Sequence, residues 1–423
     1  GVSSPDYTDG GVVSLGKEAS FRLVEGLVNG TNYRFRIRVK DSSNNISAGT
    51  LTGVITPSAT AVTTVSGVIA SDTTWAAGVF YVSGDLTVNA GVTLTIKSGV
   101  IVKFASGRMM TVNGTLTAVG TSGSPVVFTA FTDDSYGGDS NGNGLSSGTP
   151  GYWGRIYFAN TSSSRLEHAV VRYGGSGSQG SVNLYQSNVP VISSNISDGS
   201  SFGIYTYNTS PLIEGNTISN NGSHGIYHLY GSPVDRNNTI TGNSNGIYVQ
   251  YATPTIAGNT ITGNTGYGIY YYDARDAVEI TNNIITGNNI PVRLTFSSLP
   301  GASAGNILSP NTKNQIEFWG NTLSRSLVLP SAPVSIYYQV GGTATVATGV
   351  KLTVAPGVIW KLGNNSIVDI GGALYAVGSA SEKIVFTSYR DDSIGGDTNG
   401  DGFSTGLPGD WGRISFSDSV IDF

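Results

Sequence analysis

The chain of 423 residues contains no cysteine, which excludes disulfide scaffolds, thiolate zinc sites and cysteine catalysis. Charge is also scarce: Asp, Glu, Lys and Arg make up 12% of the residues, and no lysine occurs between Lys103 and Lys313. With 22 basic and 27 acidic residues, the net charge of −5 argues against a nucleic-acid partner. No run of about 18 apolar residues is present, so the sequence predicts no membrane span.

Glycine, by contrast, is abundant, with 59 residues, and hydrophobic residues make up 39% of the chain, enough for a core. The sequence opens with neither Met nor a signal peptide and stops inside a repeating pattern. We therefore expect it to be one stretch of a longer secreted or cell-surface protein.

The first 57 residues carry a strand pattern of period two. Four apolar residues alternate with four basic ones, in the order Tyr33, Arg34, Phe35, Arg36, Ile37, Arg38, Val39 and Lys40. The preceding Gly-Leu and Asn-Gly-Thr-x-Tyr segments resemble the E–F corner of a fibronectin type III domain, with Tyr33 as the corner tyrosine. This resemblance implies the carboxy-terminal half of a β-sandwich over residues 1–57, followed by a linker at 58–63. The basic residues either solvate an exposed sheet or form a binding face.

A repeat of about 22 residues runs through the middle of the chain. Gly-Ile-Tyr triplets begin at Gly203, Gly225, Gly246 and Gly268. Two asparagine columns follow, one at Asn216, Asn238, Asn259 and Asn283, the other at Asn221, Asn243, Asn264 and Asn288. These registered columns resemble the repeats of right-handed parallel β-helices of the pectate-lyase-like group, which implies an all-β solenoid.

Stacked coils place equivalent residues over one another about 4.8 Å apart. The isoleucines of the triplets would stack inside, and the asparagine amides would bond along their columns. The tyrosines that follow these isoleucines should then point outward as an aromatic ladder: Tyr205, Tyr227, Tyr248 and Tyr270.

The β-helix module is duplicated. Residues 84–158 align without a gap to residues 342–416, at a constant offset of 258. We expect module 1 over residues 64–330 and the start of module 2 over 331–423. Residues 64–423 would form a rod on the order of 75 Å long.

Each copy contains one acidic, glycine-rich loop that resembles a calcium loop. In the loop at 391–403 the candidate ligands are Asp391, Asp392, Asp397, Asn399, Asp401 and the carbonyl of Phe403. In the loop at 133–145 they are Asp133, Asp134, Asp139, Asn141 and Asn143. Pro408 stands where an EF-hand has its bidentate Glu, so Asp391 or Asp392 must supply that carboxylate. Weaker binding is expected in the first loop, where Asn143 replaces an acid; the alternative for both loops is a polar turn without an ion.

Catalysis is not expected. The acidic residues of the regular coils, in Asp235-Arg236 and in the cluster Asp273, Arg275, Asp276 and Glu279, are interpreted as surface ion pairs between coils. His224 and His228 fit neither a zinc site nor a triad.

The sequence therefore favours a non-enzymatic extracellular or cell-surface rod, structural or adhesive, with structural calcium. Its expected partners are other surface proteins, copies of itself or carbohydrate, and the aromatic ladder either contacts them or only stabilises the sheet. The alternatives are a polysaccharide-active β-helix lyase or hydrolase, and a carbohydrate-binding protein without turnover.

Overall fold

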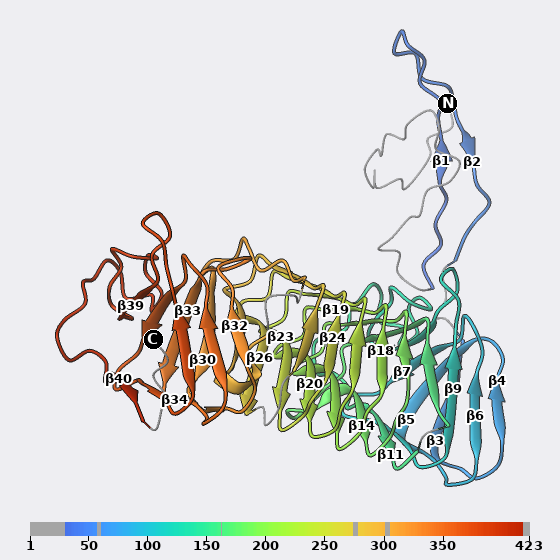
Figure 1. Cartoon of the computed structure of the whole chain (residues 1–423). Helices are drawn as coiled ribbons and strands as arrows, with labels where there is room; N and C mark the ends of the chain where they lie inside the picture. Colours follow the sequence, from blue (N-terminus) through green and yellow to red (C-terminus); the bar gives the residue numbers. More distant parts are fainter. Residues whose placement is uncertain (1–29, 57–60, 162, 274–277, 301–304, 418–423) are drawn as a thin grey trace.

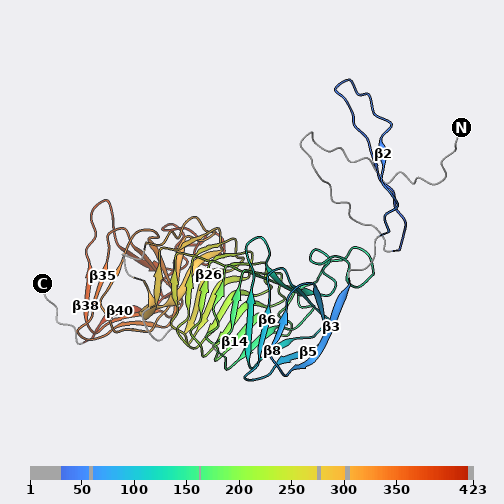
Figure 2. The ribbon, with the colours of Figure 1, turned by 90° about the vertical axis from the view of Figure 1, so that its right-hand side faces the viewer.

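The computed structural model describes residues 30–56, 61–161, 163–273, 278–300 and 305–417 (Figure 1). From Val62 onward the chain winds into coils whose short strands pair in parallel with those of the coils before and after. Figure 2 shows the same stack of coils from a second side. The prediction of an all-β parallel solenoid is therefore confirmed for the described coils.

Three ladders of strands run along the solenoid. The first, called ladder A, follows β3 (Val62–Ile69) and consists of β5 (Val79–Val88), β8 (Met110–Val112), β11 (Ile156–Ala159), β14 (Gly180–Tyr185), β17 (Phe202–Tyr207), β20 (His224–Leu229), β23 (Asn245–Gln250), β26 (Tyr267–Asp273), β29 (Ile290–Thr295), β30 (Gln315–Trp319), β33 (Ile336–Gly341), β36 (Ile359–Leu362) and β39 (Val385–Ser388). Ladder B also starts from β5 and consists of β7 (Ile101–Phe104), β10 (Val126–Ala130), β13 (Ala169–Arg172), β16 (Asn195–Ser197), β19 (Thr217–Ser219), β22 (Thr239–Thr241), β25 (Thr260–Thr262) and β28 (Ile284–Thr286). Ladder C consists of β4 (Thr73–Trp75), β6 (Thr93–Ile96), β9 (Thr115–Val119), β12 (Arg165–Glu167), β15 (Val191–Ile192), β18 (Leu212–Glu214), β21 (Val234–Arg236), β24 (Thr255–Ala257) and β27 (Glu279–Thr281).

Ladder A continues across residue 331, so one sheet joins the two expected modules. Beside it, the later coils form two new sheets. These contain β31 (Thr322–Leu323), β34 (Thr343–Val346), β37 (Ile367–Ile370) and β40 (Arg413–Phe416), and β32 (Leu327–Leu329), β35 (Lys351–Val354) and β38 (Ala373–Ala376). A short 3-10 helix, η1 (Phe296–Ser298), follows β29.

Every second side chain of each strand points inward, and these side chains form the core. Ile204, Ile226, Ile247 and Ile269 pair in register along ladder A and are completely buried, as expected. Burying one such side chain contributes about 1.5–3 kcal/mol, and each needs the neighbouring coils to cover it.

The glycine of each Gly-Ile-Tyr triplet lies inside a strand of ladder A. A Cβ on Gly225 would lie 2.7 Å from the Ile240 side chain and 2.8 Å from the carbonyl oxygen of Gly246. The glycine column is therefore required because the backbone approaches the core and the next coil closely.

Both asparagine columns form continuous buried hydrogen-bond ladders. In one, Asn216 Nδ2 donates to Asn238 Oδ1 at 3.0 Å, and Asn238 Nδ2 donates to Asn259 Oδ1 at 3.0 Å. In the other, Asn221, Asn243 and Asn264 bond in the same way at 3.0 and 3.1 Å. Each amide oxygen also accepts a backbone N–H from the previous coil. Their structural role is thus confirmed: they satisfy polar groups at buried corners.

Residues 30–56 contain a two-stranded antiparallel ribbon, β1 (Arg36–Ile37) with β2 (Thr50–Leu51). Tyr33 and Ile55 also form an antiparallel bridge, so residues 51–55 lie opposite residues 33–36. Val39, expected on a buried face, is 70% exposed. Two strands do not make a β-sandwich, so the fibronectin type III expectation is not shown; residues 1–29 of that expected domain lie outside the described residues.

Candidate functional site

The outer side of ladder A carries the predicted aromatic ladder. Tyr205, Tyr227, Tyr248 and Tyr270 pair in register, and their successive ring centroids lie 5.1, 4.9 and 5.1 Å apart. The rings are half-buried because each packs against the next, mostly edge to face. Burial raises the pKa of Tyr205 and of Tyr248 to about 12, so these hydroxyls remain hydrogen-bond donors at physiological pH.

A second aromatic row runs beside the first. It contains Tyr185, Tyr207, Tyr230 and Tyr251, with successive centroids 4.8, 6.0 and 5.4 Å apart. The two rows together are called the tyrosine face. Beside the second row lies a depression of about 300 Å³ lined by Gln186, Asn188, Asn208, Thr209, Ser210 and Gly231. Aromatic rings thus border amide and hydroxyl groups.

Further along ladder A, the first row continues into charged residues. Tyr270 pairs with Arg293, and Arg293 pairs with Glu317. The Tyr267 hydroxyl donates to Glu317 Oε2 at 2.9 Å and lies 3.1 Å from Arg293 Nη1, which is itself 3.8 Å from Glu317. Sequence reasoning missed this cluster because its members lie in different coils and share no motif.

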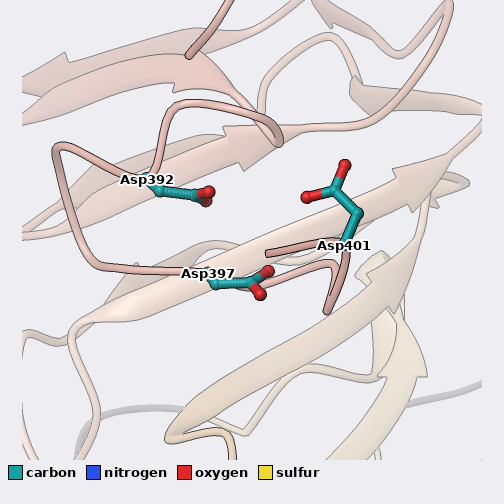
Figure 3. Close-up of side chains that lie close together, drawn as sticks. All are labelled: Asp392, Asp397 and Asp401. Carbon is teal, nitrogen blue, oxygen red and sulfur yellow. The ribbon is translucent and has the colours of Figure 1, made fainter. Parts of the chain in front are cut away.

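The loop between β39 and β40 brings three carboxylates together. One oxygen each from Asp392, Asp397 and Asp401 lies within 4.8 Å of the others, and the side chains point toward one another (Figure 3). Asp392 Oδ1 is buried and accepts no hydrogen bond. Carboxylates on a tight glycine loop, one with an unsatisfied buried oxygen, fit a Ca²⁺ ion.

The other predicted ligands of this loop are placed differently. Asp391 is outside the group, because the hydroxyls of Thr387 and Ser393 occupy its oxygens; these bonds, led by Ser393, hold the pKa of Asp391 below its usual value. Asn399 donates to Asp401 Oδ2, and the Phe403 side chain is 84% exposed.

In the first loop the described residues form no comparable acidic group. Asp133 is buried and bonded to the hydroxyls of Thr129 and Ser135. Asp139 accepts the backbone N–H groups of Gly142 and Gly144. Asn141 Oδ1 accepts the N–H of Asn143, and Asp134 Oδ1 is buried and accepts no hydrogen bond, like Asp392 Oδ1.

A buried lysine supports each loop, which the sequence did not reveal. Lys103 Nζ donates to the Gly138 carbonyl at 2.8 Å, and Lys361 Nζ donates to the Gly396 carbonyl and lies 3.9 Å from Asp392. Burial lowers the pKa of both lysines, and the loop carboxylates oppose this shift. These ammonium groups offset part of the negative charge of the loops.

The interpretation of Asp235 as a surface ion-pair residue is wrong. Asp235 is completely buried, and its Oδ2 lies 2.8 Å from Nε2 of the equally buried His228, whose Nδ1 bonds Thr206. Because side chains alternate between the two faces of a strand, both of these side chains point inward, where the coils bury them. Arg236 does form the expected surface pair, with Glu214 at 2.6 Å.

Of the second predicted cluster, Glu279 begins β27 and is exposed. The Asp273 side chain, Arg275 and Asp276 lie outside the described residues. No helix in the described ranges is long and apolar enough to cross a bilayer.

The parallel coils and asparagine ladders define a β-helix protein. Residues 154–323 match the family model described as right handed beta helix region, and residues 67–182 match the pectate-lyase like beta helix domain. These matches support the right-handed repeat.

No curated protein sequence matches the chain. Solved structures that resemble it include the periplasmic alginate epimerase AlgG, at 13% identity and a TM-score of 0.33, covering 81% of this chain and 77% of that one. Two point mutants of the same epimerase match with TM-scores of 0.33 and 0.29, at 13% and 14% identity and the same coverage. This likeness is too low for an activity or substrate to be transferred.

Proposed function

We propose that this chain is a carbohydrate-binding β-helix of an extracellular or cell-surface protein, which holds a polysaccharide along the tyrosine face without cleaving it. The observation that carries this proposal is the pair of aromatic rows that border an amide-lined depression. Tyrosine offers an apolar ring to the C–H face of a sugar and a hydroxyl to its oxygens. The coil spacing is also close to the rise of one sugar unit in an extended polysaccharide.

A binding experiment tests this proposal against a purely structural role. The double variant Tyr227→Ser/Tyr248→Ser is compared with wild type for binding to neutral polysaccharides (glucan, mannan and xylan) and to anionic ones (polygalacturonate and alginate). Affinity should fall at least tenfold while the melting temperature changes little. If the melting temperature falls and affinity is retained, the rows only stabilise the sheet.

A polysaccharide-modifying enzyme is the second candidate, favoured by the cluster of Tyr267, Arg293 and Glu317. A carboxylate beside a phenol and a guanidinium can act as an acid–base set. Incubation with the same polysaccharides, followed by analysis of chain length and sugar composition, distinguishes the two functions. Turnover by wild type that Glu317→Gln abolishes would establish the enzyme and overturn a binding-only function.

We also propose that the loop at 391–403 holds a structural Ca²⁺ ion through Asp392, Asp397 and Asp401. An ion that binds the folded loop stabilises it by mass action. Chelator should therefore lower the melting temperature of wild type, and the shift should vanish in Asp397→Asn/Asp401→Asn. An unchanged melting temperature in excess chelator would contradict the proposal.

A further inference from the structure

One exposed aromatic residue beyond the tyrosine face has a built support. Trp319 ends β30, is 49% exposed, and pairs with Gly341 of β33. A Cβ on Gly341 would lie 2.8 Å from two carbons of the indole, and one on Gly342 would lie 3.0 Å from its Nε1. The indole therefore rests against bare glycine backbone.

A second exposed aromatic residue lies in the same row, two coils away. Tyr270, Arg293 and Glu317 pair across β26, β29 and β30, and Tyr272 and Trp319 each lie two residues beyond the first and the last of them. Tyr272 is 55% exposed, whereas Thr295 is 5% exposed. Two exposed aromatic side chains thus lie at the ends of strands that are two coil spacings apart, or roughly 10 Å.

The polar residues beside this row belong to the cluster described above. Arg293 lies two positions before Thr295, and Glu317 lies two positions before Trp319. In each strand the two side chains therefore face the same side, roughly 7 Å apart. They pair with each other, and the Arg293 guanidinium lies over the rings of Tyr267 and Tyr270. Glu317 is only 5% exposed and its oxygens already accept from Tyr267 and Gln315, so it neutralises the Arg293 guanidinium and leaves little net charge for an anionic sugar.

We infer that Trp319 and Tyr272 form a subsite for an uncharged polysaccharide, with alternate sugar rings stacked on the two aromatic side chains. This inference rests on the proposed function, which it deepens by naming the sugar class and a second contact region. Stacking on an exposed aromatic ring buries the apolar C–H surface of the sugar. Contact with the Gly341 backbone fixes the orientation of the indole before the sugar binds.

Titration with the neutral glucan, mannan and xylan tests the subsite. Trp319→Ala should weaken binding of the polysaccharide that wild type binds by about tenfold. Gly341→Ala should weaken it similarly while keeping the indole, because the added methyl group displaces the ring. The matched control is Tyr375→Ala: Tyr375 is 48% exposed but belongs to β38 in another sheet, and its loss should leave affinity unchanged.

Fluorescence gives an independent readout. Trp75, Trp153 and Trp360 are buried and Trp411 is half-buried, so the part of the iodide quenching that Trp319→Tyr removes reports on Trp319. The bound neutral polysaccharide should protect wild type from quenching, and this protection should disappear in Trp319→Tyr.

The outcomes are distinct. If wild type binds no polysaccharide, both the proposed function and the subsite are wrong. If the Tyr227/Tyr248 double variant loses binding but Trp319→Ala matches the Tyr375→Ala control, only the subsite is wrong. Stronger binding of polygalacturonate or alginate than of the neutral polymers would overturn the assignment of an uncharged sugar.

Discussion

At the residue scale, the interior and the tyrosine face both place titratable groups in unusual surroundings. His228 and Asp235 are buried together in the core, whereas His224 is held on the outer side between aromatic rings. Its ring stacks 5.3 Å from Phe202 and 4.5 Å from Tyr248, and burial lowers the pKa of His224 to about 4. His224 is therefore neutral at physiological pH and extends the aromatic packing.

His224 should make stability depend on pH. The unfolded chain protonates this histidine near pH 6.5, but the folded protein does so only near pH 4. Between these values the unfolded state binds more protons, so the free energy of unfolding falls as the pH drops from about 6.5 towards 4, by roughly 1–3 kcal/mol. Urea unfolding at pH 7 and pH 4.5 should show a smaller difference for His224→Phe than for wild type. Equal differences would contradict this assignment.

The buried pair of His228 and Asp235 should be sensitive to truncation. Asp235→Ala removes the partner of His228 Nε2 and should lower the free energy of unfolding by about 3 kcal/mol. Glu214→Ala is a suitable control because it breaks the surface pair with Arg236, for which we expect less than about 1 kcal/mol. Urea denaturation measures both. A similar small loss in the two variants would show that the buried pair contributes little.

At the element scale, the asparagine ladders connect one coil to the next. Asn243 Oδ1 accepts from both the backbone N–H and the side-chain amide of Asn221, and Asn243 Nδ2 donates to Asn264. Because these groups are buried, breaking one rung leaves several polar atoms without partners and out of reach of solvent.

Asn243→Ala should therefore lower the free energy of unfolding by about 2–4 kcal/mol. Thr265→Ala, an exposed position in the next coil, should change it by less than about 0.5 kcal/mol. Equilibrium urea unfolding of both variants measures the difference, and a loss as small as that of Thr265→Ala would mean that the ladder contributes little.

At the scale of the whole molecule, the sequence duplication and the strand ladders are out of phase. The offset of 258 relates β36 and β39 to β7 and β10 of ladder B, yet β36 and β39 continue ladder A. The junction is filled by an aromatic core cluster, in which Phe318 lies 5.5 Å from both Phe296 and Trp360. This cluster joins coils on both sides of residue 331.

We expect one thermal unfolding transition for the wild-type solenoid, because ladder A and this cluster couple the two modules. Phe318→Ala should destabilise the protein by about 3–5 kcal/mol and separate the transition into two. The control Phe128→Ala removes an equally buried ring within module 1 and should lower the melting temperature without separation. Calorimetry that shows two transitions in wild type would contradict the coupling.

The sequence by itself determined the coils, the inward isoleucines and the asparagine ladders, because these features depend on contacts between equivalent residues in neighbouring coils. A period of about 22 residues makes such contacts visible as columns in the sequence. Only the tertiary structure decided the features that break the repeat. These are the burial of Asp235, the placement of Asp392 rather than Asp391 beside Asp397 and Asp401, and the contact of Trp319 with Gly341. Each depends on atoms brought together from non-equivalent positions, where neither spacing nor residue type predicts which side chains meet.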